Sequence, residues 1–194
     1  NCFLMKIKSL IILAVSALVM TACGNNQNNK AAEETAAPVA ITIDSLYVNG
    51  EALVGELIEI EGVCSHICSH SASKIFLLGE TNPKALRVEA AELGSFAQEC
   101  VNSVVKVQGM LREERIDEAY LQSWEQRIAD KSAEQHGNGE GGCDTEKSAR
   151  GETANSDEGR IADFRARIAE RQQAEGKDYL SFYFVEAEAY EIVE

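Results

Sequence analysis

Residues 53–63 read Leu-Val-Gly-Glu-Leu-Ile-Glu-Ile-Glu-Gly-Val, and residues 104–112 read Val-Val-Lys-Val-Gln-Gly-Met-Leu-Arg. Apolar and polar residues alternate along much of both stretches, which is the period of a strand with one buried face. The first stretch contains Gly55 and Gly62, where a strand bends or bulges readily, and the second contains Gly109. Bent strands of this kind favour a small closed or partly open barrel.

Other segments add to this pattern. Strand-like alternation is present at residues 39–48, 74–79, 86–90 and 179–193. The sequence Glu80-Thr81-Asn82-Pro83 supplies a turn between the second and third of these segments. Residues 93–102 are predicted to form a short helix before the 104–112 strand. The chain is therefore expected to be mostly β with some α.

The two glycine-containing stretches resemble the "hydrophobic-x-hydrophobic-x-Gly-x-hydrophobic" strands of the OB-fold. The resemblance covers residues 53–112 and 179–193. The chain is also similar to periplasmic OB-like lipoproteins in which a Cys/His segment separates the first two barrel strands. The resemblance implies an OB-like five-stranded barrel within a domain at residues 39–194. OB-folds bind oligonucleotides, sugars, proteins and metals, so the fold alone does not decide the function.

A helical insertion is predicted before the last strand, at residues 113–175. One apolar stripe recurs every four residues, at Ile116, Tyr120, Trp124 and Ile128. A second stripe is formed by Ile161, Phe164 and Ile168. Such spacing predicts two amphipathic helices that pair as a hairpin. Residues 131–159 between them are rich in Gly, Ser, Asn and Glu, which is typical of a mobile loop.

The first 22 residues resemble a secretory signal peptide. Lys6 and Lys8 precede an apolar core at residues 9–19 that is short for a membrane span. The sequence Met20-Thr21-Ala22-Cys23 then resembles the lipobox of bacterial lipoproteins, although leucine is more usual at the place of Met20. This resemblance implies that residues 1–22 are removed and that Cys23 carries the lipid.

The resemblance also implies a location in the cell envelope. Residues 23–38 are polar and of low complexity, as expected of a flexible tether between a membrane and a periplasm-facing domain. Gly24 is not acidic, which favours the outer membrane. Removal of residues 1–22 takes away two lysines and no acidic residue, and changes the net charge from −14 to −16. Such a chain repels phosphate backbones, so we expect no nucleic-acid partner. A cation or a basic protein is the more favourable partner for its negative charge.

The run Cys-Ser-His-Ile-Cys-Ser-His at residues 64–70 carries the candidate chemistry. It places potential metal ligands at alternate positions, namely Cys64, His66, Cys68 and His70. Thiol and imidazole groups bind Zn²⁺ and copper. In a straight strand these four side chains would spread over roughly 20 Å of one face. A single ion therefore requires the segment to curl, with Cys100 as a further candidate ligand.

Disulfide formation competes with metal binding, because an envelope location is oxidising. Apart from Cys2 and Cys23, the chain has Cys64, Cys68, Cys100 and Cys143, which permit three complete pairings. A Cys68–Cys100 or Cys64–Cys100 bridge would join the turn after the first barrel strand to the predicted short helix. A thiol–disulfide redox site and a surface loop without chemistry are further alternatives, since the run has Cys-x-x-x-Cys and not Cys-x-x-Cys.

Enzymatic motifs do not stand out in the sequence. It has no phosphate-binding glycine loop, no nucleophile elbow and no His-Glu-x-x-His pattern. We therefore expect a membrane-anchored binding protein that captures Zn or Cu through the Cys/His segment. The alternative is a cell-envelope protein-interaction module with structural disulfides, and a redox protein is the third hypothesis. Metal analysis of protein purified under reducing conditions separates the first hypothesis from the others.

Overall fold

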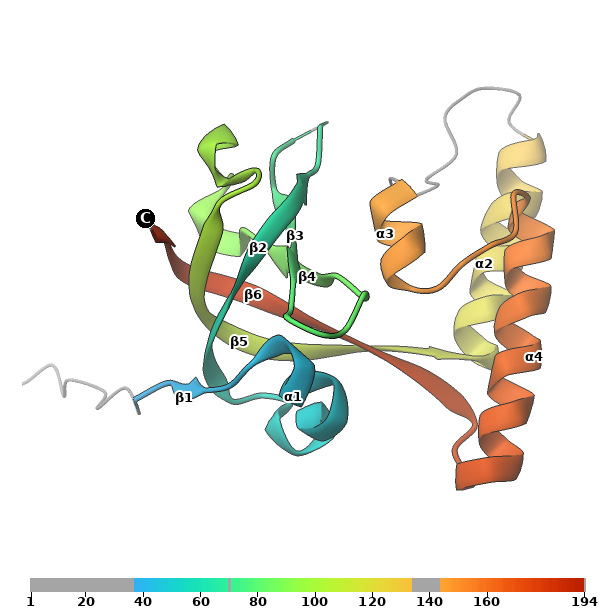
Figure 1. Cartoon of the computed structure of the whole chain (residues 1–194). Helices are drawn as coiled ribbons and strands as arrows, with labels where there is room; N and C mark the ends of the chain where they lie inside the picture. The colour runs from blue at the N-terminus through green and yellow to red at the C-terminus, as the bar shows by residue number, and fades with distance from the viewer. Residues whose placement is uncertain (1–36, 70, 134–143, 194) are drawn as a thin grey trace, which may run out of the picture. The chain divides into compact units, whose positions relative to one another are not determined.

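Five strands close into a barrel in the computed structural model, which describes residues 37–69, 71–133 and 144–193. The barrel strands are β2 (Leu57–Ile67), β3 (Lys74–Leu78), β4 (Leu86–Glu89), β5 (Val104–Asp117) and β6 (Tyr179–Val193). Figure 1 shows them wrapped around a common interior. The predicted mostly-β fold with an OB-like five-stranded barrel is confirmed.

The ring closes because β5 pairs along both of its edges. β2 runs antiparallel to β3 and to β5, β3 runs antiparallel to β4, and β5 runs antiparallel to β6. The remaining gap is filled by a parallel pairing of β4 with β6, in which Arg87 lies opposite Phe184. The barrel interior is filled by apolar side chains that include Ile58, Ile75 and Val107, each essentially inaccessible to solvent.

Two glycines permit the close approaches that the barrel requires. A Cβ atom on Gly62 would lie 2.6 Å from both Ile43 Cδ1 and the Leu78 carbonyl oxygen. A Cβ atom on Gly109 would overlap the Glu186 carbonyl oxygen and lie 2.8 Å from Val185 Cγ1. The β5–β6 register shifts between Gln108 and Gly109, so the second glycine lies at an irregularity of the sheet.

The prediction of a strand over residues 39–48 is wrong for most of its length. Only β1 (Val39–Ala40) is a strand, and it pairs in parallel with β2. The chain then forms helix α1 (Ile43–Asn49), which begins where the Thr42 hydroxyl accepts a hydrogen bond from Ser45 N at 3.1 Å. The helix buries Ile43 and Leu46, which are three residues apart. This spacing suits one face of a helix, whereas a strand would bury every second residue. A 3₁₀ turn, η1 (Gly50–Leu53), follows.

The predicted short helix at residues 93–102 is replaced by two 3₁₀ turns. These are η2 (Ala91–Leu93) and η3 (Gln98–Cys100). Gly94, with φ of 79°, ends the first turn in a conformation that a continuing helix cannot adopt. Cys100 is nevertheless buried at the end of the second turn.

The insertion between β5 and β6 contains the two predicted helices, α2 (Glu118–Ala133) and α4 (Asp157–Glu175). It starts later than predicted, because β5 and β6 continue as a two-stranded ribbon out to Asp117 and Tyr179. Figure 1 shows this ribbon leading from the barrel to the paired helices. A short helix, α3 (Asp144–Ala149), lies within the stretch 131–159, where the sequence predicts a loop, and residues 134–143 lie outside the described residues.

The paired helices have a hydrophobic core of their own. Its fully or nearly fully buried members are Ile116, Leu121, Ile161 and Phe164. The Phe164 ring lies 6.3 Å from the Trp124 ring and 6.0 Å from the Phe182 ring, measured between centroids. The predicted apolar stripes of both helices thus meet over the end of the β5–β6 ribbon.

The N-terminal predictions lie almost entirely outside the described residues. These are the signal peptide at residues 1–22, the lipidated Cys23, and the tether at 23–38 apart from its last two residues. Within the described ranges, no helix has the length and apolar character needed to span a membrane.

Candidate functional site

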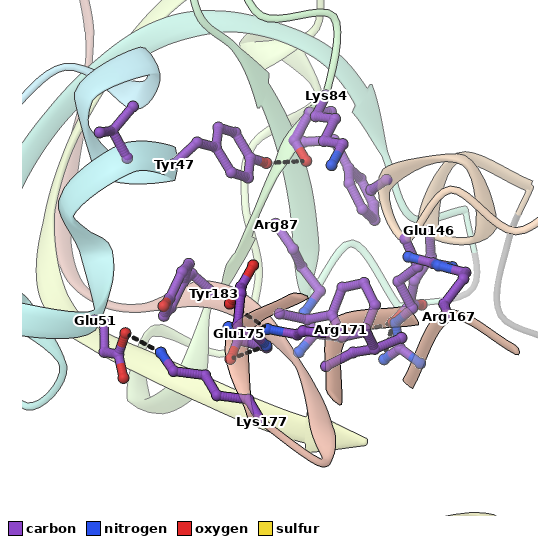
Figure 2. A pocket seen from close by; sticks show the side chains of 18 residues that line it. Tyr47, Glu51, Lys84, Arg87, Glu146, Arg167, Arg171, Glu175, Lys177 and Tyr183 are labelled. Atoms are coloured by element: carbon purple, nitrogen blue, oxygen red, sulfur yellow. Dashed lines mark hydrogen bonds and ion pairs between the residues drawn. The ribbon is translucent and has the colours of Figure 1, made fainter. Parts of the chain in front are cut away.

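A cleft of about 460 Å³ lies between the barrel and the helical insertion. Its walls come from α1, from β3 and β4, from α3 and α4, and from the part of β6 that leads to the insertion. In Figure 2, Tyr47 and Lys84 lie at the top of the view and Arg171 and Lys177 lie below, with Arg87 between them. A volume of this size suits a small-molecule ligand.

The cleft is rich in positive charge although the whole chain is acidic. Its basic lining residues are Lys84, Arg87, Arg150, Arg167, Arg171 and Lys177, and its acidic ones are Glu51, Glu146 and Glu175. Six of the chain's 18 lysines and arginines therefore line one cleft, in a protein with a net charge of −14. With six basic and three acidic residues, the lining has an excess of positive charge, and such an excess raises the local concentration of anions.

Arg87 is the centre of an ion-pair network between the barrel and α3. Its guanidinium donates to Glu146 Oε1 at 2.8 Å and to Glu114 Oε2 at 3.2 Å, and its side chain is only 11% exposed. Arg150 contacts the same two carboxylates, at 3.5 and 2.7 Å. Lys74 approaches Glu146 at 3.4 Å. The network holds α3 against the outer face of β3 and β4. Its carboxylates neutralise part of the positive charge of the cleft.

Glu146 is ionised in this setting. Burial by itself would raise the pKa of the Glu146 carboxyl, but the charges of Lys74, Arg87 and Arg150 together outweigh it. The pKa consequently lies below its ordinary value of 4.5. The three cations thus bind a carboxylate that the protein itself supplies.

The depressed pKa of Glu146 predicts an acid-sensitive contribution to stability. Because the folded pKa lies below the unfolded value, the stabilisation is present above the unfolded pKa and is lost as the pH falls through the folded pKa. Glu146→Gln should lower the free energy of unfolding by about 1–3 kcal/mol at neutral pH. The deficit should shrink as the pH falls through the folded-state pKa of Glu146, measured by urea unfolding. Glu170→Gln, at an exposed position on α4, is the matched control, and an equal pH dependence in both variants would contradict the assignment.

Helix α4 supplies Arg167 and Arg171, one turn apart on one side of the helix. Arg167 Nη1 is buried and makes no hydrogen bond, although Asp163 Oδ2 lies 3.6 Å away. The Arg167 guanidinium lies 5.3 Å from the ring centre of Phe164 and 5.9 Å from that of Phe182. Arg171 Nη1 donates to the Tyr179 carbonyl at 2.9 Å. Arg167 Nη1 and Arg87 Nε are thus buried donors of the cleft lining that have no hydrogen-bond partner in the described structure.

Tyr47 supplies a neutral phenol at the opposite wall. Its hydroxyl donates to the Ala85 carbonyl at 3.0 Å, and burial raises the pKa of Tyr47 to about 12. The phenol therefore stays protonated at all physiological pH values. Phe76, Phe182 and Tyr183 add aromatic surface to the lining. The cleft combines hydrogen-bond donors with ring faces, a combination suited to a polar, ring-shaped anion.

The Cys/His run lies outside this cleft lining and is divided between the two faces of β2. Cys64 is fully buried among the side chains of the barrel interior. His66 instead packs on the outer side against Phe76, with 5.9 Å between ring centroids, and its Nε2 is buried without a hydrogen-bond partner. The register shift between Cys64 and His66 makes Ser65 an extra residue. Residues two apart therefore do not share a face here, as they would in a regular strand.

The other predicted ligands are also placed separately. Cys68 is half-buried where β2 ends, and its N–H donates to the Lys74 carbonyl at 2.9 Å. Cys100 is fully buried in the same cluster as Cys64. His70 lies outside the described residues. No group of three or more His, Cys, Asp or Glu side chains within the described ranges is arranged to hold a metal, so the Zn or Cu hypothesis stays a prediction.

Sequence reasoning did not single out the cleft residues. Arg87 occupies an outward position between buried Leu86 and Val88, and such a position is usually a solvated face of a strand. Arg167 and Arg171 share a helix with the predicted apolar stripe. The available signal was the spacing of four between these two arginines, which places both on one side of α4.

Comparison with known proteins adds no family or curated relative, because neither a protein-family model nor a curated sequence matches the chain. The geometry of the cleft is consequently the basis for assigning a function.

Proposed function

We propose that this protein is a lipid-anchored envelope protein that binds a small polar anion, carrying a carboxylate or phosphate, in the cleft between barrel and insertion. The observation that carries the proposal is the gathering of six basic side chains in one cleft of a strongly acidic chain. The lipobox-like sequence before Cys23 supports the envelope location. Binding, and not catalysis, is proposed because the lining is dominated by paired arginines and lysines.

The chemistry of the lining supports an anionic ligand. Arginine presents a planar fork of donors that matches carboxylate and phosphate, and such charge-assisted hydrogen bonds are among the stronger ones in proteins. Arg167 Nη1 is a buried donor without a hydrogen bond, although it forms an ion pair with Asp163 Oδ2 at 3.6 Å. A buried donor of this kind costs free energy unless a partner reaches it, so ligand binding at this position is favoured.

The acidic surface limits the size of the ligand. With a net charge of −14, the rest of the protein repels a long polyanion. A small anion within the cleft lies mainly in the field of the nearby cations, because charges beyond about 8 Å are screened at physiological ionic strength. The proposal therefore favours a monomeric acidic sugar or phosphate ester over a nucleic acid.

The cleft lies on the face of the barrel that OB-folds commonly use to bind ligands. β3 and β4 are the second and third strands of the barrel, and the insertion occupies the connection between its fourth and fifth strands. In OB-folds, the face of strands two and three, together with the loop after the fourth strand, is where oligonucleotides and oligosaccharides bind. The α3–α4 part of the insertion covers this face and narrows it to a cleft for a smaller ligand.

Substitutions in α4 test the proposal. Arg167→Gln should weaken the binding of galacturonate or inorganic phosphate by roughly 10- to 100-fold, the loss expected for one charge-assisted hydrogen bond. Arg165→Gln is the matched control, because Arg165 lies on the same helix, pairs with Glu118 and Glu125, and does not line the cleft. Isothermal titration calorimetry measures both.

A second variant separates binding from folding. The ammonium group of Lys84 has no ion pair in the described structure and lies on an exposed residue that lines the cleft. Lys84→Gln should leave the unfolding midpoint unchanged and weaken anion binding about two- to fivefold. Unchanged anion affinity in both Arg167→Gln and Lys84→Gln would contradict the proposed site.

A further inference from the structure

Two buried thiols face the same interior at one end of the barrel. Cys64 lies on the inward side of β2 and Cys100 lies at the end of η3, and both are fully shielded from solvent. Both belong to the cluster of side chains that fills the barrel. Neither thiol lines the cleft, so the chemistry of this pair is independent of anion binding.

The backbone holds the two cysteines close together. Cys64 N donates to the Ser103 carbonyl at 2.9 Å, and Asn102 N donates to the Cys64 carbonyl at 2.8 Å. Ser103 N donates to the Cys100 carbonyl at 3.0 Å, which closes a tight turn over residues 100–103. Cys100 therefore begins the turn whose last two residues, Asn102 and Ser103, are hydrogen-bonded to Cys64.

The electrostatics of the thiols agree with this proximity. Burial raises the pKa of Cys64 and that of Cys100, and a thiolate at Cys64 would raise the pKa of Cys100 further. Both groups are consequently protonated in the folded, reduced protein. A protonated, buried thiol reacts slowly with external reagents, so a bond between the two forms most readily while the chain is folding.

We propose that Cys64 and Cys100 form the structural disulfide of this protein when it folds in the presence of a disulfide oxidant. One cysteine thiolate attacks a sulfur of the oxidant and releases one thiol. The second cysteine thiolate then attacks the mixed disulfide and releases the other thiol. Two protein thiols are oxidised by two electrons, and one disulfide of the oxidant is reduced to two thiols.

Cys68 is excluded from this bond by its position. It is half-buried at the end of β2, and it does not belong to the cluster that contains the other two thiols. Its N–H is directed to the Lys74 carbonyl across the start of the turn that leads to β3. Of the two bridges to Cys100 that the sequence predicts, the structure therefore favours Cys64–Cys100.

Mass mapping tests the pairing. The full chain is unfolded, reduced and refolded in a buffer of reduced and oxidised glutathione, then alkylated and digested without reduction. We expect a peptide cross-linked through Cys64 and Cys100, with Cys68 joined to neither of them. The bond closes the long loop of residues 64–100, so the oxidised protein should unfold roughly 5–15 °C above the reduced protein.

Single substitutions make the outcome decisive. Cys68→Ser should retain the cross-link and the thermal shift, whereas Cys100→Ser should lose both and leave Cys64 alkylated. A cross-link between Cys68 and either Cys64 or Cys100 would overturn the proposal. So would full alkylation of Cys64 and Cys100 in refolded wild-type protein, or their protection by stoichiometric Zn²⁺ under reducing conditions. None of these results depends on anion binding in the cleft.

Discussion

Replacing Phe164 with alanine is expected to lower the free energy of unfolding by about 3–5 kcal/mol, the usual cost of truncating a buried phenylalanine. The Phe164 side chain is fully buried in the small core of the insertion. Its ring packs against Trp124 and Phe182, and the guanidinium of Arg167 lies over it. Because this core contains few residues, few neighbouring side chains can move into the cavity that the ring leaves.

The effect should be largest in the insertion. The insertion core and the barrel core are separate clusters, so loss of the Phe164 ring loosens α4 without removing a contact inside the barrel. Urea unfolding followed by Trp124 fluorescence should shift strongly, and anion binding should weaken because α4 carries Arg167. Val48→Ala, at a position that is 81% exposed, should change stability by less than about 0.5 kcal/mol. A Phe164→Ala protein as stable as this control would contradict the role of the insertion core.

Gly109→Ala is expected to destabilise the barrel by roughly 3 kcal/mol. The added Cβ atom would overlap the Glu186 carbonyl oxygen and lie 2.9 Å from the Ala187 Cα atom. Both neighbours are backbone atoms of β6 and cannot move aside as a flexible side chain would. Relief requires β5 and β6 to separate at the place where their register shifts.

Gly55→Ala is the comparison for this prediction. Gly55 has φ of 90° and no neighbouring atom near its hypothetical Cβ, so the substitution strains the backbone conformation without a clash. Its expected cost is about 1–2 kcal/mol. Thermal unfolding should therefore rank wild type above Gly55→Ala and Gly55→Ala above Gly109→Ala. The reverse order of the two variants would show that backbone contact between β5 and β6 does not limit residue size at position 109.

The barrel could be predicted because its strands carry a strong local signal. The alternation in residues 57–63 and 104–111 reflects burial of one side of each strand, and Gly62 and Gly109 fall where neighbouring backbone comes close. The stripes of the insertion helices are equally local, since residues four apart share a face. The strand prediction fails at residues 43–49 because about two turns of amphipathic helix and a short alternating strand have similar apolar patterns over seven residues.

The arrangement of the candidate sites was less predictable, for two physical reasons. A single extra residue at Ser65 turns His66 to the opposite face from Cys64, and nothing in the run Cys-Ser-His marks this bulge. The cleft depends on which distant segments meet, because Arg87 comes from β4, Arg150 follows α3, and Arg167 lies on α4. The parallel β4–β6 pairing and the docking of α3 create this meeting, and neither has a local signature.

Titration of the wild-type protein with galacturonate and with inorganic phosphate, beside neutral galactose, tests the central claim most directly. At low ionic strength, calorimetry should show saturable one-to-one binding of at least one anion and none of galactose. Added salt should weaken the binding, Arg167→Gln should reduce it at least tenfold, and Arg165→Gln should leave it unchanged. No saturable binding of either anion, or equal losses in Arg167→Gln and Arg165→Gln, would contradict the assignment of the cleft as an anion-binding site.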